Sequence, residues 1–267
     1  VCSSDLEKFI PNRVKHFVNR CDLVFTPTET MKGYLLQSGA ESKIEILPTG
    51  LEDEYFDLNG NESKEIRNTY IGDNKYLFCT VSRLSKEKNL HFFIDGLLEL
   101  KNKIGDCFNT MVIGDGPLKK ELEERVQRLG LHNNVTFIGK VDNKKIKDYY
   151  GACDLFLFSS KSETQGIVLL EAMASKLPVV AVKASGVMDV VKNDVNGYMT
   201  TENKEYWAKR ILDIIMNNNL RLKLKDGAFR TSKEYSNSKI AKLALHYYEE
   251  VILECYRRGQ EYAFKIG

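Results

Sequence analysis

The feature that most constrains the fold is an alternation between short apolar segments and longer amphipathic ones along most of the chain. Each apolar segment is rich in β-branched and aromatic residues and is followed by a turn or a helical pattern. Strands and helices that alternate in this way form βαβ units around a parallel sheet. The predicted strands are DLVFT, IEILP, YLFCTVS, FNTMVIG, NVTFIG, CDLFLFSS and PVVAV. The sequence therefore predicts an α/β fold.

Two helix starts are predicted from proline. Thr26, Pro27 and Glu29 form a capping pattern with proline at the first helical position. Pro117 is predicted to open PLKKELEERVQRL in the same way.

The domain organisation follows from a break in this rhythm. With 267 residues, of which 43% are hydrophobic, the chain can form one large or two smaller domains. Near Pro48 a polar passage, PTGLEDEYFDLNGNES, interrupts the pattern and is interpreted as a connection between two sheets. After Tyr198 the strands are predicted to stop, and the last of three helical patterns covers Ser238 to Arg258. We predict three parts: residues 1–47, 48–235 and 236–267.

Charged residues and glycines follow several predicted strands, where ligands bind in open α/β sheets. Arg83 and Lys88 follow YLFCTVS, Gly114 ends FNTMVIG, and Lys140 and Val141 follow NVTFIG. Two cations at one strand end, opposite the free amides of a helix start, make a site for a diphosphate.

The stretch SETQGIVLLEA follows CDLFLFSS and holds two glutamates. Glu163 lies in the loop before a helix predicted to begin near Gly166, and Glu171 lies about a turn and a half inside it. Both can face one cleft, where carboxylates accept hydrogen bonds from the paired hydroxyls of a nucleotide sugar. Taken singly, Glu171 would be read as a surface residue, but AMASKLPVVAV after it looks like the buried side of a helix that leads into a strand.

Composition excludes several classes of partner. The formal net charge of +2 gives no broad attraction toward nucleic acid. The six cysteines are scattered without a CxxC pair, which favours buried thiols in a reducing compartment. From Asn203 onward 13 basic and 8 acidic residues would suit an anionic membrane surface, although a solvated face is favoured. The predicted location is cytoplasmic, soluble or peripheral at the inner face of the membrane.

Other chemistries fit the sequence poorly. A dinucleotide-binding G-x-G-x-x-G motif fails because Lys119 stands where the third glycine belongs. The four histidines lack the spacing of metal ligands or of a catalytic triad. The acidic cluster at residues 52–54 is interpreted as a solvated loop, so no metal site is predicted.

Four segments in this order and spacing resemble the donor half of the retaining glycosyltransferases of family 4. They are RLSKEKNL, VIGDGPLKKELE, VTFIGKV and SETQGIVLLEAMASKLPVVAV, and the resemblance covers about Lys43 to Tyr198. It implies a GT-B fold: a complete C-terminal Rossmann-like donor domain in residues 48–235, preceded by only the end of an N-terminal Rossmann-like acceptor domain in residues 1–47. The C-terminal helix in residues 236–267 would pack back on the N-terminal domain.

The resemblance also implies residue roles. Arg83 and Lys88 would bind the donor diphosphate, Glu163 would contact the transferred sugar, and Glu171 would hold the ribose. Glu163, Arg83 and Lys88 are the candidate catalytic residues. The remaining donor-binding candidates are backbone groups and small residues around the sugar, phosphates and base: Gly114, Lys140, Val141, Gln165, Gly166, Ile167 and Val168. Many family members have phenylalanine where Gln165 stands.

The function implied is transfer of a hexose, with glucose and UDP favoured, from a nucleoside diphosphate sugar to an acceptor. ETQG resembles the subgroup that glucosylates diacylglycerol, and a polysaccharide or glycan acceptor stays open. UDP versus GDP, and which hexose, also stay open. No cofactor or metal is expected, since the chain contains no D-x-D pair. Because the first residue is Val1 and the acceptor half has no counterpart, we also expect an alternative: a truncated chain that binds the nucleotide sugar and transfers nothing.

Overall fold

The computed structural model describes residues 13–57 and 60–266. The chain divides into two units by contact, one of Val1–Gly50 with Tyr235–Gly267 and the other of Leu51–Glu234. The two units are described separately below.

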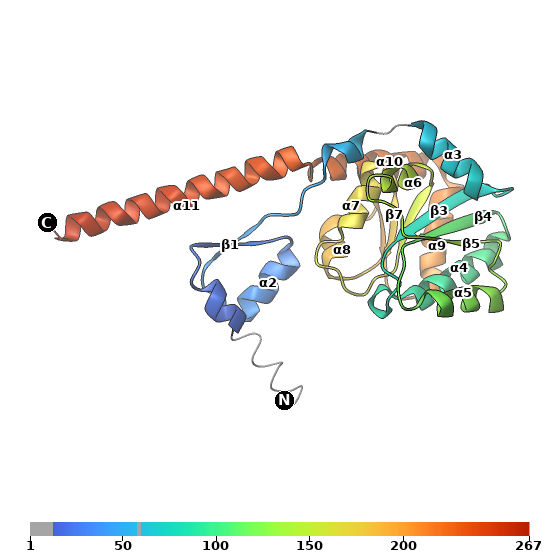
Figure 1. Cartoon of the computed structure of the whole chain (residues 1–267), viewed down its shortest axis with the longest axis horizontal. Coiled ribbons are helices and arrows are strands. Elements are labelled where there is room, and N and C mark those ends of the chain that lie inside the picture. The colour runs from blue at the N-terminus through green and yellow to red at the C-terminus, as the bar shows by residue number, and fades with distance from the viewer. Residues whose placement is uncertain (1–12, 58–59, 267) are drawn as a thin grey trace, which may run out of the picture. The chain divides into compact units, whose positions relative to one another are not determined.

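The larger unit is built on a six-stranded sheet in which every neighbouring pair of strands is parallel (Figure 1). The strand order is β5-β4-β3-β6-β7-β8. The bounds are β3 Tyr76–Val81, β4 Phe108–Ile113, β5 Val135–Gly139, β6 Leu155–Phe158, β7 Val179–Val182 and β8 Gly197–Thr200. The predicted α/β fold with a parallel sheet is confirmed.

Helices cover both faces of this sheet (Figure 1). On one face lie α4 (Leu90–Ile104), α5 (Lys119–Arg128) and α9 (Lys204–Met216). On the other lie α3 (Gly60–Ile71), α6 (Ile146–Gly151), α7 (Ile167–Ala174) and α10 (Asn218–Lys233), while the short α8 (Ser185–Val190) follows β7. Because neither face meets water, a strand such as β4 is buried at every residue, which is why its sequence is a continuous run rather than an alternation.

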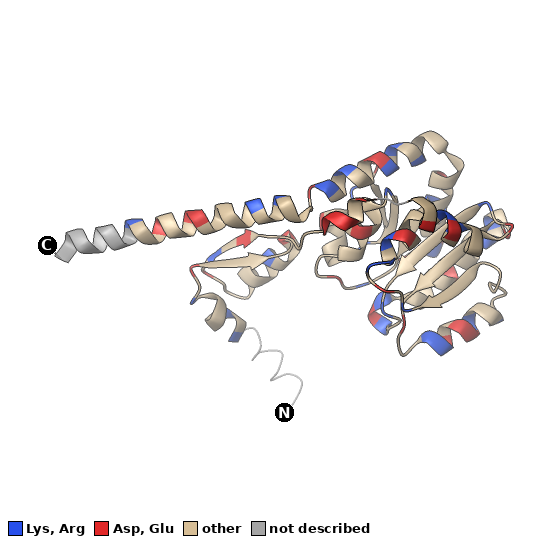
Figure 2. Cartoon of the chain, turned by 45° about the horizontal axis from the view of Figure 1, so that its top comes forward, with Lys and Arg blue, Asp and Glu red and all other residues tan. Residues whose placement is uncertain are grey.

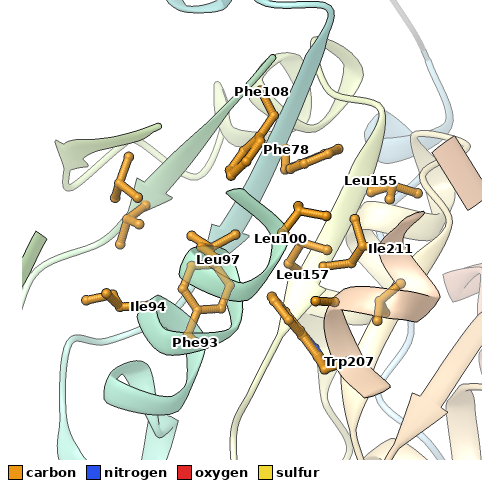
Figure 3. Close-up of a cluster of buried hydrophobic side chains, with 14 of the residues drawn as sticks. Phe78, Phe93, Ile94, Leu97, Leu100, Phe108, Leu155, Leu157, Trp207 and Ile211 are labelled. Carbon is orange, nitrogen blue, oxygen red and sulfur yellow. The ribbon is translucent and has the colours of Figure 1, made fainter. Parts of the chain in front are cut away.

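The core on the α4 and α9 face is organised around Trp207 (Figure 3). Its ring is fully buried and meets Phe93 edge-on at 5.6 Å between ring centroids. A Cβ on Gly96 would lie 2.6 Å from a ring carbon of Trp207, so only glycine fits there. This contact locks α4 to α9 and fixes the helices that support the central strands.

The smaller unit holds two parallel strands, β1 (Leu23–Thr26) and β2 (Lys43–Ile46), with α2 (Glu29–Gln37) between them in sequence. The long helix α11 (Asn237–Ile266) belongs to the same unit. Lys43 Nζ contacts Glu250 Oε2 at 3.0 Å, and the Phe25 and Tyr247 rings lie 5.7 Å apart. These contacts join α11 to β1 and β2.

All seven predicted strands are present, but β8 was missed. The sequence analysis ended the strands at Tyr198, whereas β8 continues to Thr200 beside β7. Its first residue, Gly197, reads as a turn in the sequence. A Cβ on Gly197 would lie 2.1 Å from the Val179 carbonyl oxygen, so this glycine permits close strand pairing instead.

Both predicted helix starts are wrong by two residues. Thr26 ends strand β1, and Thr28 caps α2, where its Oγ accepts the Met31 N–H at 3.3 Å. Helix α5 begins at Lys119 rather than at Pro117. In both cases proline lies in the turn ahead of the helix.

Lys and Arg positions are interspersed with Asp and Glu along the described helices (Figure 2). Among the helices of residues 13–57 and 60–266, none has the length and apolar character needed to cross a bilayer.

Candidate functional site

The order of the strands places a crevice at the carboxyl ends of β3 and β6. From β3 the chain proceeds to β4 and β5 on one side, then returns to β6, which pairs with β3 from the other side. The loops that follow β3 and β6 therefore run in opposite directions away from a shared edge. Ligands bind at such a switch point in open α/β sheets.

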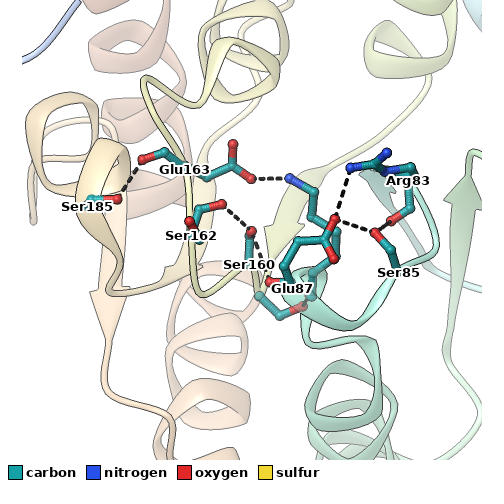
Figure 4. Close-up of polar contacts among 9 residues, drawn as sticks. Arg83, Ser85, Glu87, Ser160, Ser162, Glu163 and Ser185 are labelled. Carbon is teal, nitrogen blue, oxygen red and sulfur yellow. Dashed lines mark hydrogen bonds and ion pairs between the residues drawn. The ribbon is translucent and has the colours of Figure 1, made fainter. Parts of the chain in front are cut away.

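These two loops are bonded to one another (Figure 4). Ser159 Oγ donates to the Lys88 carbonyl oxygen at 2.7 Å, and the Lys161 N–H donates to the Glu87 carbonyl oxygen at 2.9 Å. Ser160 Oγ adds a bond to the same Glu87 oxygen at 3.3 Å. The two loops thus form one rigid wall beside the crevice.

Lys88 and Glu163, both predicted site residues, form an ion pair between these two loops. Lys88 Nζ lies 2.6 Å from Glu163 Oε1, and the two side chains are 19% and 14% exposed. The Glu163 carbonyl oxygen accepts from Ser185 Oγ at 2.6 Å and from the Gly186 N–H at 2.9 Å. The backbone of Glu163 is therefore fixed by Ser185 and Gly186, while its carboxylate is bound by Lys88.

Arg83 is far more exposed than Lys88, with 72% of its side chain accessible. Its guanidinium contacts Glu87 Oε1 at 3.2 Å, and the same oxygen accepts from Ser85 Oγ at 2.6 Å. The Ser85 hydrogen bond, with Arg83 nearby, holds the pKa of the Glu87 carboxyl below its usual value. Glu87 therefore stays ionised and steadies the arginine at the crevice.

A cavity of about 810 Å³ opens at this edge of the sheet, a size common for small-molecule sites. The predicted residues that line it are Arg83, Gly114, Lys140, Val141, Val168 and Glu171. The other predicted residues, Lys88, Glu163, Gln165, Gly166 and Ile167, lie in the β3 and β6 loops or at the first residue of α7 and do not line the cavity. Arg83, Lys140 and the Glu171 carboxylate thus face one space.

Glu171 is half-buried beneath the cavity rather than on an outer surface. Its Oε2 accepts from Tyr150 Oη at 2.9 Å, and Tyr55 also bonds to this carboxylate. Burial raises the pKa of Glu171, while the two tyrosine hydrogen bonds oppose that rise. The reading of Glu171 as a plain surface residue is therefore wrong.

The start of α7 is shaped by glycine, as the sequence predicts. Gly166 occupies the N-cap position with φ of 70°, a conformation that favours glycine. The amides of Ile167 and Val168 follow it in the first turn, where a helix has no acceptor of its own to offer. Gln165 before it is 6% exposed, and a Cβ on Gly186 would come within 2.7 Å of its backbone nitrogen.

Backbone packing explains the glycines of the GDGP turn after β4. A Cβ on Gly114 would lie 1.9 Å from the Ser82 carbonyl oxygen, and one on Gly116 would lie 2.4 Å from the Leu84 carbonyl oxygen. The turn therefore packs directly on the loop after β3. This close packing accounts for both glycines, so they do not indicate a dinucleotide-binding motif.

The sequence analysis missed several residues of the site. Ser82, Asp115 and Asn143 line the cavity. Ser82 ends a predicted strand and the other two residues follow one, so the strand-end rule could have found them. Tyr55 also lines it, from the 3₁₀ turn Asp53–Phe56, within the passage interpreted as a connection between two sheets. Tyr150 lies beneath in α6, and no sequence signal marks it.

Among the described residues, no three His, Cys, Asp or Glu side chains are grouped closely enough to hold a metal ion.

Comparisons with known proteins match this site region. The family model described as glycosyl transferases group 1 matches residues 61–231. An alpha-monoglucosyldiacylglycerol synthase of Streptococcus pneumoniae is 32% identical over 172 residues, which cover 63% of this chain and 39% of that protein. The protein of the same name from Acholeplasma laidlawii is 25% identical over 260 residues, covering 92% of this chain and 65% of that protein. The chain thus spans less than two thirds of the length of either relative.

Solved structures share the fold. The Anabaena protein HepE, in complex with UDP and glucose, matches with a TM-score of 0.80 and 25% identity over 90% of this chain and 66% of its own. Its complex with UDP-glucose matches with a TM-score of 0.77 and 26% identity, over 90% of this chain and 69% of its own. The predicted GT-B type of α/β fold, with a Rossmann-like domain, is confirmed by these matches.

Proposed function

We propose that this chain, which belongs to the glycosyl transferases group 1 family, binds a UDP-hexose in the cavity at the carboxyl ends of its central strands. One observation carries the proposal: the cavity gathers Arg83 and Lys140 with the Glu171 carboxylate at a switch point of a parallel sheet. Cations suit a diphosphate, and a carboxylate suits paired hydroxyls. The complexes of HepE with UDP and UDP-glucose support this class of ligand.

We propose that the residues take the roles that the family resemblance implies. Arg83 and Lys88 bind the diphosphate, and Glu163, bonded to Lys88 at the wall, takes the hydroxyls of the transferred sugar. Glu171 takes the ribose. Backbone groups from Gln165 to Val168 line the sugar and phosphates, and Gly114, Lys140 and Val141 line the nucleoside end.

The reaction proposed is transfer of the hexose with retention of configuration. Its transition state resembles an oxocarbenium ion while negative charge accumulates on the leaving diphosphate. Fixed cations such as Arg83 and Lys88, with the first amides of α7, stabilise that charge without reorganising. We therefore propose that this donor set acts without a divalent metal.

The acceptor proposed is diacylglycerol, with glucose as the sugar moved, at the inner face of a membrane. The support is the name shared by the two relatives, alpha-monoglucosyldiacylglycerol synthase. A glycan acceptor is the alternative, because the mannosylfructose-phosphate synthase of Agrobacterium fabrum, whose name is not that of a lipid enzyme, is also 27% identical over 199 residues. A further alternative is that the chain binds the nucleotide sugar and transfers nothing.

Calorimetric titration tests donor binding. UDP-glucose should bind the whole chain, and Arg83→Ala should weaken UDP binding about tenfold or more, because charge-assisted hydrogen bonds contribute about 1.5–3 kcal/mol each. Arg128→Ala, an exposed arginine at the end of α5, is the matched control and should change nothing. Absence of UDP-glucose binding by the unaltered chain would refute the donor site.

A transfer assay then separates the alternatives. Radiolabelled UDP-glucose is incubated with the chain and vesicles that contain diacylglycerol. Labelled glucolipid supports the lipid acceptor. Donor binding without transfer to lipid or glycan supports the alternative of a binding protein.

A further inference from the structure

The Glu171 carboxylate lies between two tyrosine hydroxyls that come from different elements. Tyr150 Oη in α6 bonds to Glu171 Oε2 at 2.9 Å, and Tyr55 from the turn Asp53–Phe56 bonds to the same carboxylate. An ionised carboxylate can only accept, so both hydroxyls donate to it. Glu171 is thus bound by a residue of helix α6 and by a residue of the segment that begins the larger unit.

The two tyrosines differ in how they are held. Tyr150 is fully buried, and its ring meets Phe156 of β6 edge-on at 5.7 Å between centroids, which fixes its rotamer. Tyr55 is half-buried and lines the cavity itself. A rigid donor below and a second donor at the rim leave the carboxylate little freedom to rotate.

The number of acceptor positions on the Glu171 carboxylate indicates which ligand group it can bind. A carboxylate offers about four acceptor positions, and the tyrosines occupy about two of them. Because Glu171 lines the cavity, about two positions are left for a ligand there, which matches the two neighbouring hydroxyls of a ribose. We propose that Tyr55 and Tyr150 are positioning residues that aim Glu171 at the ribose diol of the bound nucleotide, an inference that rests on the proposed function.

The surroundings of Glu171 define the charge state that this role needs. Burial raises the pKa of Glu171, and hydrogen bonds from Tyr150 and Tyr55 lower it. Burial, with Glu171 beside them, raises the pKa of both tyrosines, so each keeps its proton and remains a donor near neutral pH. Other titratable groups next to the pair or in the cavity are Glu52 beside Tyr55, Cys79 beside Tyr150, and Arg83, Asp115 and Lys140.

Selectivity for the ribose tests the inference. The unaltered chain should bind UDP about tenfold or more tightly than 2′-deoxy-UDP in calorimetric titrations, since the deoxy ligand leaves a charged acceptor unpaired. Tyr150→Phe should reduce that ratio about fivefold, and Tyr55→Phe should reduce it in the same direction. Tyr149→Phe is the matched control. Tyr149 directly precedes Tyr150 in α6, and it interacts with Tyr70 rather than with Glu171, the two rings lying 6.4 Å apart.

The pH dependence of binding provides a second readout. UDP-glucose is the ligand because the charge of its diphosphate does not change over the pH range tested. Binding should weaken as pH falls and Glu171 takes a proton. Without the Tyr150 hydroxyl the pKa of Glu171 rises further, so the loss should begin at a higher pH in Tyr150→Phe and not in Tyr149→Phe.

Each outcome decides between the two claims. No binding of UDP-glucose by the unaltered chain refutes the donor site itself. Binding without preference for ribose, or a Tyr150→Phe chain that keeps both the ribose ratio and the pH midpoint, overturns the positioning role while the donor site stands. If circular dichroism shows that Tyr150→Phe is misfolded, Tyr55→Phe at the cavity rim decides the matter by the same two readouts.

Discussion

At the scale of single residues, the pair formed by Lys88 and Glu163 sets the charge balance of the crevice. The ammonium and the carboxylate lie 2.6 Å apart and are mostly shielded from water. A shielded charge is stabilised only while its partner is present. A diphosphate that binds Lys88 must therefore compete with Glu163, and the sugar hydroxyls that bind Glu163 must compete with Lys88.

Glu163→Gln separates these two effects. The amide cannot neutralise Lys88, so UDP should bind about 3- to 10-fold more tightly, a gain of about 1 kcal/mol from removal of the competitor. The preference for UDP-glucose over UDP should fall, because a charged acceptor for the sugar is lost. Glu121→Gln, which removes a carboxylate that lies outside the cavity lining and 3.1 Å from His91, is the control.

Calorimetry with UDP and UDP-glucose measures both effects. Weaker or unchanged UDP binding in Glu163→Gln would show that Lys88 is not the cation the diphosphate meets.

Residue by residue, the sequence predicts the cations and carboxylates of the site but not how they are held. Arg83 and Lys140 were predicted because charged side chains after apolar strands collect at one edge of a parallel sheet. Glu171 was predicted from its place about a turn and a half inside the helix that begins near Gly166. That Glu171 rests on Tyr150 and Tyr55 was not predictable, because hydrogen bonds between residues 21 apart or more depend on how α6 and the turn before α3 pack. The pairing of Lys88 with Glu163, 75 residues apart, escaped for the same reason.

At the scale of elements, the contact between Gly96 of α4 and Trp207 of α9 predicts a loss of stability in Gly96→Ala. The added Cβ would lie 2.6 and 2.8 Å from two ring carbons, and the fully buried ring has no room to withdraw. Overpacking costs about 1–3 kcal/mol, of which the better helix propensity of alanine offsets about 1 kcal/mol. The net loss should be up to about 2 kcal/mol in the free energy of unfolding.

Urea unfolding followed by the fluorescence of Trp207, the single tryptophan, measures this loss. Gly60→Ala in α3, where a new Cβ meets nothing within 4 Å, is the matched substitution and should be close to neutral. Equal stability of the two variants would contradict the packing argument.

Strands and helices were predictable from the sequence where the hydrophobic pattern alone determines their position. The seven predicted strands are apolar runs bounded by polar residues. Five of them, β3 to β7, lie in the six-stranded sheet that is covered on both faces, so pattern and structure agree there. Strand β8 escaped because Gly197 carries a turn signal, and what makes it a strand is the close approach of β7. The start of α2 was misplaced because Thr26 and Thr28 are equally good caps in sequence, and pairing of β1 with β2 settles which one is used.

At the scale of the whole molecule, the division into two units predicts two responses to ligand. The cavity residues all belong to Leu51–Glu234, so a nucleotide sugar should stabilise that unit alone. At a hundredfold excess over Kd the gain is about 2.7 kcal/mol. The unfolding transition reported by Trp207 should therefore move to higher temperature in UDP-glucose.

The control is the part of the far-UV circular dichroism change that does not follow the Trp207 signal. We expect that part to come from the smaller unit, which holds α11. That change should keep its midpoint when UDP-glucose is added. A common shift of both signals would show that the two units unfold together.

The wholly parallel sheet also dictates an order of events during synthesis. No pair of its strands is joined by a hairpin, and β3 must wait for β6, with Phe78 opposite Leu155, before the two loops can meet. The last cavity residue in the chain is Glu171, so a nascent chain has no place for a nucleotide until that residue has left the ribosome. The polypeptide must therefore find its central strand pairing unaided, and the donor can protect only a domain that has already folded.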